Sequence, residues 1–88
     1  MPHPPDPRPQ LRIVRPFPDE RVRVLALSPS GVRIEHQLHL NPGADCALEF
    51  PVEAGVMARV GKVIRCTSLM GRNLPFWYES EIEFQAAA

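Results

Sequence analysis

The regular alternation of apolar and polar residues is the dominant pattern in this chain, and it predicts β-strands. Val32 and Ile34 alternate with Arg33 and Glu35, as expected for a strand with one buried face and one solvent-facing one. The same period of two recurs along the chain, and no segment has the period of an amphipathic helix. The predicted strands are residues 11–15, 21–27, 31–36, 45–50, 56–66 and 76–84.

The alternation also predicts which side chains share a face and where strands end. Pro51 is expected to end the strand before it, and Asn41-Pro42-Gly43 is a strong turn signal because proline and glycine favour the two turn corners. A glycine at position 61 is expected to mark a bend or bulge. Two apolar faces are predicted, one made of Val22, Val24 and Ala26 and the other of Val56, Ala58, Val60, Ile64 and Cys66.

A chain of 88 residues has room for one small core, so we expect a single domain. The fold class predicted is all-β, as a small five- or six-stranded antiparallel β-barrel spanning residues 11–85, because closure removes vulnerable strand edges. Seven of the first eighteen residues are proline. Proline cannot donate to a strand ladder, so residues 1–10 are expected to be a flexible Pro/Arg-rich arm.

The net charge is zero, but it is unevenly distributed, with +3 on residues 1–33 and −3 on residues 34–88. Nine of the ten basic residues are arginine, the side chain that grips phosphates and guanine edges as a planar fork. A neutral total argues against coating of a nucleic acid polymer but permits one local anion site. No apolar run is long enough to cross a membrane and no secretory signal is evident, so we expect a cytoplasmic protein.

Other residues with chemical potential have simpler interpretations as structural or surface groups. Cys46 and Cys66 lie in apolar strands and are expected to be buried free thiols. His36 and His39 are expected to be exposed loop histidines rather than metal ligands, because side chains three apart on a strand face opposite sides. Trp77 and Tyr78 are expected to be half in the core and half on the surface. Glu79, Glu81 and Glu83 are expected to form a solvated face of the last strand.

The segment from Ala26 to Gly31 joins two predicted strands through a short turn that carries Ser28. Such a turn directs a hydroxyl and backbone N–H groups outward, which suits a polar or anionic ligand. The segment resembles the signature of PilZ domains, bacterial receptor modules for the second messenger cyclic di-GMP, which is written Asp/Asn-x-Ser-x-x-Gly. Ser28 and Gly31 match it, and Ala26 stands where the family has Asp or Asn.

The resemblance extends over about residues 8–84. Gly31-Val-Arg-Ile-Glu35, Cys46-Ala-Leu-Glu-Phe50 and Gly61-Lys-Val-Ile-Arg-Cys66 follow the family's order, and Tyr78-Glu-Ser-Glu-Ile-Glu-Phe84 is similar to its Tyr-x-x-Gly-Val-x-Phe ending, with Glu81 in place of glycine. Because few residues follow Phe84 in the sequence, we expect the helix that often follows the family's barrel to be missing or reduced.

The family's second motif, Arg-x-x-x-Arg on a flexible arm, is matched in spacing by Arg8 and Arg12. The resemblance therefore implies that cyclic di-GMP is held between these arginines and the turn of Ser28 and Gly31. Arg15 and Arg33 are additional candidates, and Arg21 could replace one of the arm arginines. No resident cofactor or metal is implied.

Three functions follow from these observations. The first is a non-catalytic signalling module that binds cyclic di-GMP, and the second is a degenerate PilZ adaptor that has lost the nucleotide and contacts an unidentified protein partner. The third is a small RNA- or DNA-binding barrel, against which the neutral charge and the glutamate-rich last strand count. Ser28 and Ser30 lack a neighbouring His–Asp pattern, so we do not expect an enzyme.

Overall fold

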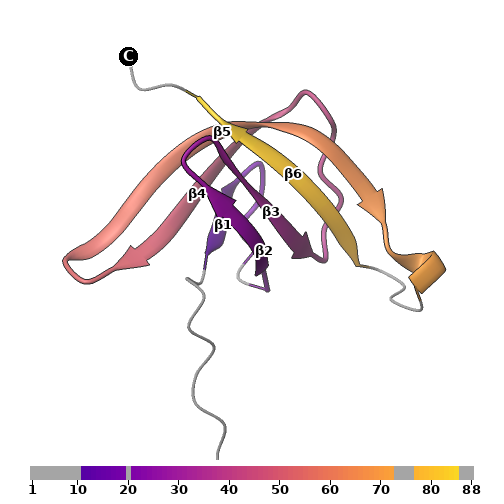
Figure 1. Ribbon diagram of the computed structural model, residues 1–88, viewed down its shortest axis with the longest axis horizontal. Helices are drawn as coiled ribbons and strands as arrows, with labels where there is room; N and C mark the ends of the chain where they lie inside the picture. Colours follow the sequence, from indigo (N-terminus) through magenta and orange to yellow (C-terminus); the bar gives the residue numbers. More distant parts are fainter. Residues whose placement is uncertain (1–10, 20, 73–76, 86–88) are drawn as a thin grey trace, which may run out of the picture.

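The computed structural model describes residues 11–19, 21–72 and 77–85, which form one antiparallel sheet of six strands. The strands follow the spatial order β1-β4-β5-β6-β3-β2 (Figure 1). The all-β prediction is therefore confirmed, and the predicted arm of residues 1–10 lies outside the described residues. The elements are β1 (Arg12–Arg15), β2 (Arg23–Ser28), β3 (Gly31–His36), β4 (Asp45–Val52), β5 (Gly55–Ser68), the 3-10 turn η1 (Met70–Arg72) and β6 (Tyr78–Phe84).

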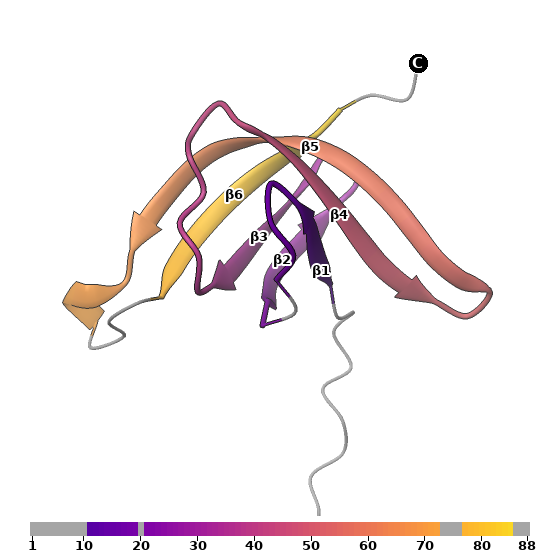
Figure 2. The ribbon, with the colours of Figure 1, turned by 180° about the vertical axis from the view of Figure 1, so that it is seen from behind.

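The sheet is strongly curved, and its concave face holds the hydrophobic core. β5 and β6 arch over the shorter strands, as the front and back views show (Figures 1 and 2). Burying this apolar face is the main term that favours folding of so small a domain. Leu40, in the loop between β3 and β4, belongs to this core, and Leu69, which follows β5, is also buried. The buried cluster on the strands and their approaches is Leu11, Ile13, Val24, Val32, Ile34, Cys46, Leu48, Phe50, Val63 and Ile82.

The sheet is not closed into a barrel, which corrects the predicted closure. β1 and β2 are its two edges, and no ladder joins them in the described part of the chain. The backbone N–H and C=O of Ile13 instead bond to Asp19 at 2.8 and 2.9 Å, after the chain reverses through Pro16 and Pro18. Because these groups lie on the edge of β1 that would have to meet β2, the chain's own return occupies the closing position.

β4 continues through Pro51 instead of ending before it, which corrects the predicted strand end. Pro51 lies opposite Val56, and Val52 lies opposite Gly55. β1 reaches only as far as Glu49 on the other side of β4. The proline nitrogen therefore faces an edge where no hydrogen bond is required, which is where strands tolerate proline.

The predicted apolar face of β5 is wrong in its direction. Val56 and Val60 are 60% and 43% exposed, on the outer side of the sheet. The inner positions are instead the alternate ones, including Gly61 and Val63, because these lie opposite or beside buried residues of β4. A register shift between Val63 and Arg65 then leaves Ile64 exposed and returns Cys66 to the core side. Periodicity therefore grouped Val56, Ala58 and Val60 correctly, but it could not show that this group is on the outer face or that Cys66 lies on the opposite side.

Two glycines allow β3 and β5 to approach β6 closely from both sides. A Cβ on Gly31 would lie against the carbonyl oxygen of Ile82, at a distance that real Cβ atoms do not adopt. A Cβ on Gly61 would lie 2.6 Å from the carbonyl oxygen of Glu83 and 2.7 Å from the Cγ2 atom of Ile82. Neither glycine is among those with positive φ, so close packing, not turn conformation, requires them.

We predict that Gly31→Ala lowers the free energy of unfolding by about 1–3 kcal/mol, the usual cost of overpacking a well-filled contact. The measurement is chemical denaturation in the absence of any ligand. Gly71→Ala is the matched control, because nothing lies within 4 Å of the position its Cβ would take. Equal stability of the Gly31 variant and the wild type would contradict the close-packing role.

Candidate ligand-binding site

The turn between β2 and β3 is tight and carries two hydroxyl groups. Ser28 lies opposite Gly31 at the end of the ladder, so that Pro29 and Ser30 form the turn itself. The oxygen atoms Oγ of Ser28 and Ser30 are 3.0 Å apart, and the Ser30 N–H donates to the Ser28 Oγ over 3.3 Å. Both serines are exposed. The hydroxyls therefore hold each other in place at the surface, where a ligand can reach them.

A bulge in β2 places Ala26 on the outer face, which corrects its predicted grouping with Val24. The register shifts between Val24, which lies opposite Ile34, and Ala26, which lies opposite Arg33. The extra residue reverses the direction of the side chains that follow it. Ala26 is consequently exposed and shares a face with Ser28 and Arg33, whereas Val24 is buried.

A row of directly opposed residues crosses four strands on this outer face. Ala26 on β2 is opposite Arg33 on β3, which is opposite Glu81 on β6, which is opposite Arg65 on β5. The Arg65 Nη2 atom donates to the Glu81 Oε2 atom over 2.7 Å. Arg33 has no ion pair among the described residues, so its guanidinium is free to meet an anion.

The row borders a shallow hollow of about 340 Å³ beside the turn. Its polar lining comprises Ser28 and Ser30 on the turn, the cations Arg33 and Arg65, and the acids Glu81 and Glu83. The two positive and two negative charges of this lining sum to zero. Arg65 and Glu81 are paired with each other. Sequence reasoning missed Arg65 as a member of this site. The opposite charges at positions 65 and 81 are a usable signal only when the pairing of β5 with β6 is known.

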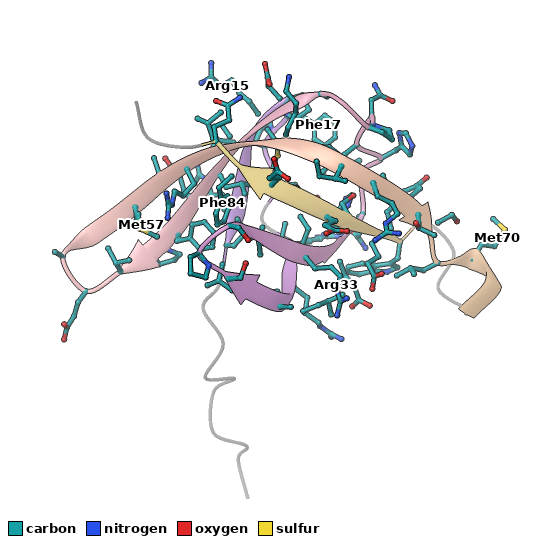
Figure 3. The ribbon with its side chains drawn as sticks, turned by 45° about the horizontal axis from the view of Figure 1, so that its top comes forward. Arg15, Phe17, Arg33, Met57, Met70 and Phe84 are labelled. Carbon is teal, nitrogen blue, oxygen red and sulfur yellow. The ribbon has the colours of Figure 1, made fainter. Side chains whose placement is uncertain are left out.

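The other candidate arginines lie elsewhere. Arg8 is outside the described residues. Arg12 on β1 lies 3.6 Å from Glu49 and lines two different hollows, together with Arg21 in each. Arg15 and Arg33 extend from opposite sides of the molecule in Figure 3. The structure thus brings Ser28, Gly31 and Arg33 together and leaves Arg12 apart from them.

Comparison of the chain with protein-family models, curated proteins and solved structures gave no match. In the described residues, no group of three or more His, Cys, Asp or Glu side chains is arranged to hold a metal ion. The only described helical element is the short turn η1, and no helix in that part of the chain is long and apolar enough to cross a membrane.

Apart from the outer-face site, a buried polar pair, His36 and Ser80, lies inside the core, and the sequence analysis did not predict it. His36 is fully buried, which corrects its predicted position in an exposed loop. Its Nδ1 atom is 2.8 Å from the carbonyl oxygen of Leu38, and its Nε2 atom is 2.6 Å from the hydroxyl of Ser80. Because the carbonyl can only accept, Nδ1 carries the hydrogen and Nε2 accepts from Ser80. His36 also stacks on Tyr78, with ring centroids 6.0 Å apart.

Burial determines the protonation of His36 and of Cys46. Desolvation lowers the pKa of His36 below its usual 6.5, and a smaller effect of His39 acts in the same direction. The Leu38 hydrogen bond and the charge of Asp19 oppose this shift. Burial also raises the pKa of Cys46 to about 11, so this free thiol is not a reactive nucleophile. The prediction of buried thiols is confirmed for Cys46, whereas Cys66 is only partly buried.

We predict that the His36–Ser80 pair makes stability depend on pH. Unfolded His36 takes up a proton near pH 6.5, whereas the folded residue does so only at lower pH. The unfolded state therefore binds more protons in this window, and the free energy of unfolding falls as the pH drops below about 6.5. The measurement is urea denaturation at several pH values between about 5 and 7.

The double variant His36→Leu with Ser80→Ala removes the titrating group together with its partner, so this part of the pH dependence should disappear. His39→Asn is the control, because this exposed histidine has no bond to Ser80 and is the smallest of the influences on the pKa of His36, so most of the pH dependence should remain. An unchanged pH profile in the double variant would show that other groups cause the effect.

Proposed function

We propose that this chain is a non-catalytic signalling module that binds cyclic di-GMP on the outer face of its sheet, around the turn of Ser28 and Gly31. The observation that carries the proposal is the placement of Ala26, Ser28 and Arg33 on one exposed face beside a hollow. The resemblance to PilZ domains marks positions 26 and 28. Arg33 is an additional candidate, and it has no ion pair in the described part of the chain. The assignment to that family remains part of the proposal.

The chemistry of the hollow fits the two parts of such a ligand. An arginine fork suits either a phosphate or the O6 and N7 atoms of guanine, and Arg33 is available for this role. The serine hydroxyls of the turn can donate to phosphate oxygens. Position 26 itself offers no acceptor for guanine N1–H and N2–H₂, because it is alanine. Glu81 is bonded to Arg65, so the other carboxylate in the hollow is that of Glu83, opposite Gly31.

The two glutamates in the lining of the hollow favour a second function. Glu81 and Glu83 cancel the charge of Arg33 and Arg65 in the hollow, which weakens attraction of a dianionic ligand. The alternative proposal is therefore a PilZ-like adaptor that no longer binds the nucleotide and acts through contact with another protein. Titration calorimetry with cyclic di-GMP separates the two functions, with cyclic di-AMP as the matched ligand control.

We predict that Arg33→Ala weakens cyclic di-GMP binding by about tenfold or more, because it removes a charge-assisted fork. Arg12→Ala is the matched control, since this residue lies in different hollows and beside Glu49. Binding is measured by calorimetry on samples whose melting temperatures are also recorded. Loss of affinity in the Arg12 variant but not in the Arg33 variant would move the site to the N-terminal arm and away from the hollow.

We predict that Ala26→Asp tightens cyclic di-GMP binding by about 1–3 kcal/mol, the value of a hydrogen bond to otherwise unpaired donors. Ala26 is exposed and opposite Arg33, so the new carboxylate stays in solvent and the fold is preserved. The gain should be absent for cyclic di-AMP, because adenine lacks the N1–H and N2–H₂ donors. A folded variant that still ignores cyclic di-GMP would leave only the adaptor function.

A further inference from the structure

We infer that residues 55–59 of β5 pair edge to edge with the same segment of a second copy of this chain, in antiparallel orientation. The inference rests on an unpaired strand edge and is independent of the proposed ligand. β6 pairs with β5 only from Gly61 onward, where Phe84 is the partner. Before that point the β4–β5 hairpin extends beyond the other strands (Figure 1).

The direction of the free backbone groups follows from the ladder. The carbonyl oxygen of Val60 accepts from the Gln85 N–H at 2.9 Å, so Val60 turns its backbone toward the β6 side. Every second residue of an antiparallel strand faces the same neighbour, so Val56 and Ala58 direct their N–H and C=O groups to this side as well. Within the described part of the chain no strand lies opposite them.

The two outer edges of the sheet are protected, whereas nothing among the described residues covers this edge. On β1, the edge groups of Ile13 are bonded to Asp19. On β2, the bulge after Val24 and the exposed Arg23 interrupt pairing with another chain. Bulges, charges and returning loops are the usual protections of strand edges. The segment Gly55–Val60 carries no proline, bulge or acidic residue.

The side chains of the segment are apolar and exposed on both faces. Val56 is 60% exposed, and Val60 and Met57 are 43% and 42% exposed. Met57 lies far out on the hairpin in Figure 3. The one charged residue, Arg59, places its guanidinium 5.0 Å from the ring centroid of Phe84 and so does not project from the edge. An apolar edge without repelling charge favours strand addition.

A second copy is the partner that this edge fits best. Two-fold antiparallel pairing sets Val56 and Ala58 of one copy against the same segment of the other, so each free donor meets a free acceptor. On the outer face, the exposed side chains of Val56 and Val60 would then pack against the side chains of the same segment in the second copy. So short a contact is far smaller than a standard interface, and we expect a dissociation constant of roughly 10 μM to 1 mM.

The test is sedimentation of the full chain from about 10 μM to 1 mM, with Val56→Lys and Ile64→Lys as a matched pair. Both residues are exposed on β5, but Ile64 lies where β6 already covers the edge. We predict that Val56→Lys weakens dimerisation by about tenfold or more, because an edge lysine opposes strand pairing, and that Ile64→Lys leaves it unchanged.

Ala58→Pro is the second variant, since it removes an edge N–H without touching the bonds to β4. Amide exchange of Val56 and Ala58 should slow as the wild-type concentration rises, with the β4-facing amide of Met57 as internal reference. A monomer over the whole concentration range would overturn the inference. So would a dimer that both edge variants leave intact, or one in which these amides are not protected.

Discussion

The close approach of three strands at Ile82 and Glu83 is the constraint on which the rest of the structure depends. β3 and β5 can flank β6 here only because positions 31 and 61 lack a Cβ. Because the strands lie so close together, the side chain of Ile82 is fully buried in the core. The same contact fixes the register of β3 and β6, which places Arg33 opposite Glu81. β5 and β6 arch over the shorter strands (Figure 1), and Gly61, Ile82 and Glu83 belong to these two strands. Core packing and the outer charged row therefore share one origin.

The alternation of apolar and polar residues was enough to locate all six strands, because each alternates over several residues. It could not show which face is buried in β5, since over residues 56–63 each of the two alternating sets is mostly apolar and each is interrupted by one cation, Lys62 or Arg59. The bulge beside Val24 and the hydrogen bonds between Asp19 and Ile13 each involve only one or two residues. They do not change the alternation of apolar and polar residues, so the pattern could not predict them. Barrel closure was predicted from the need to protect edges, and the chain meets that need at β1 by folding back on itself.

The candidate site was predictable only in its local part. Ser28, Gly31 and Arg33 are close in sequence, so a hairpin brings them together whatever the rest of the fold does. Arg65 and Glu81 join them through long-range pairing, and the bond between His36 and Ser80 likewise spans residues 44 apart. Pairs of this kind are fixed by register, which depends on bulges and core packing rather than on any local motif.

The two residues that match the PilZ turn do not carry equal functional weight. Gly31 is required by the carbonyl oxygen of Ile82 behind it, so the fold alone accounts for this glycine. Ser28 is exposed, and its hydroxyl bonds only within the turn, to the hydroxyl and N–H of Ser30 and to the carbonyl oxygen of Gly31. Core packing therefore imposes no comparable demand for a hydroxyl there. Arg33 is likewise exposed and has no ion pair among the described residues, although an acid faces it across the ladder. The case for a ligand at this turn therefore depends on Ser28 and Arg33, which packing does not explain.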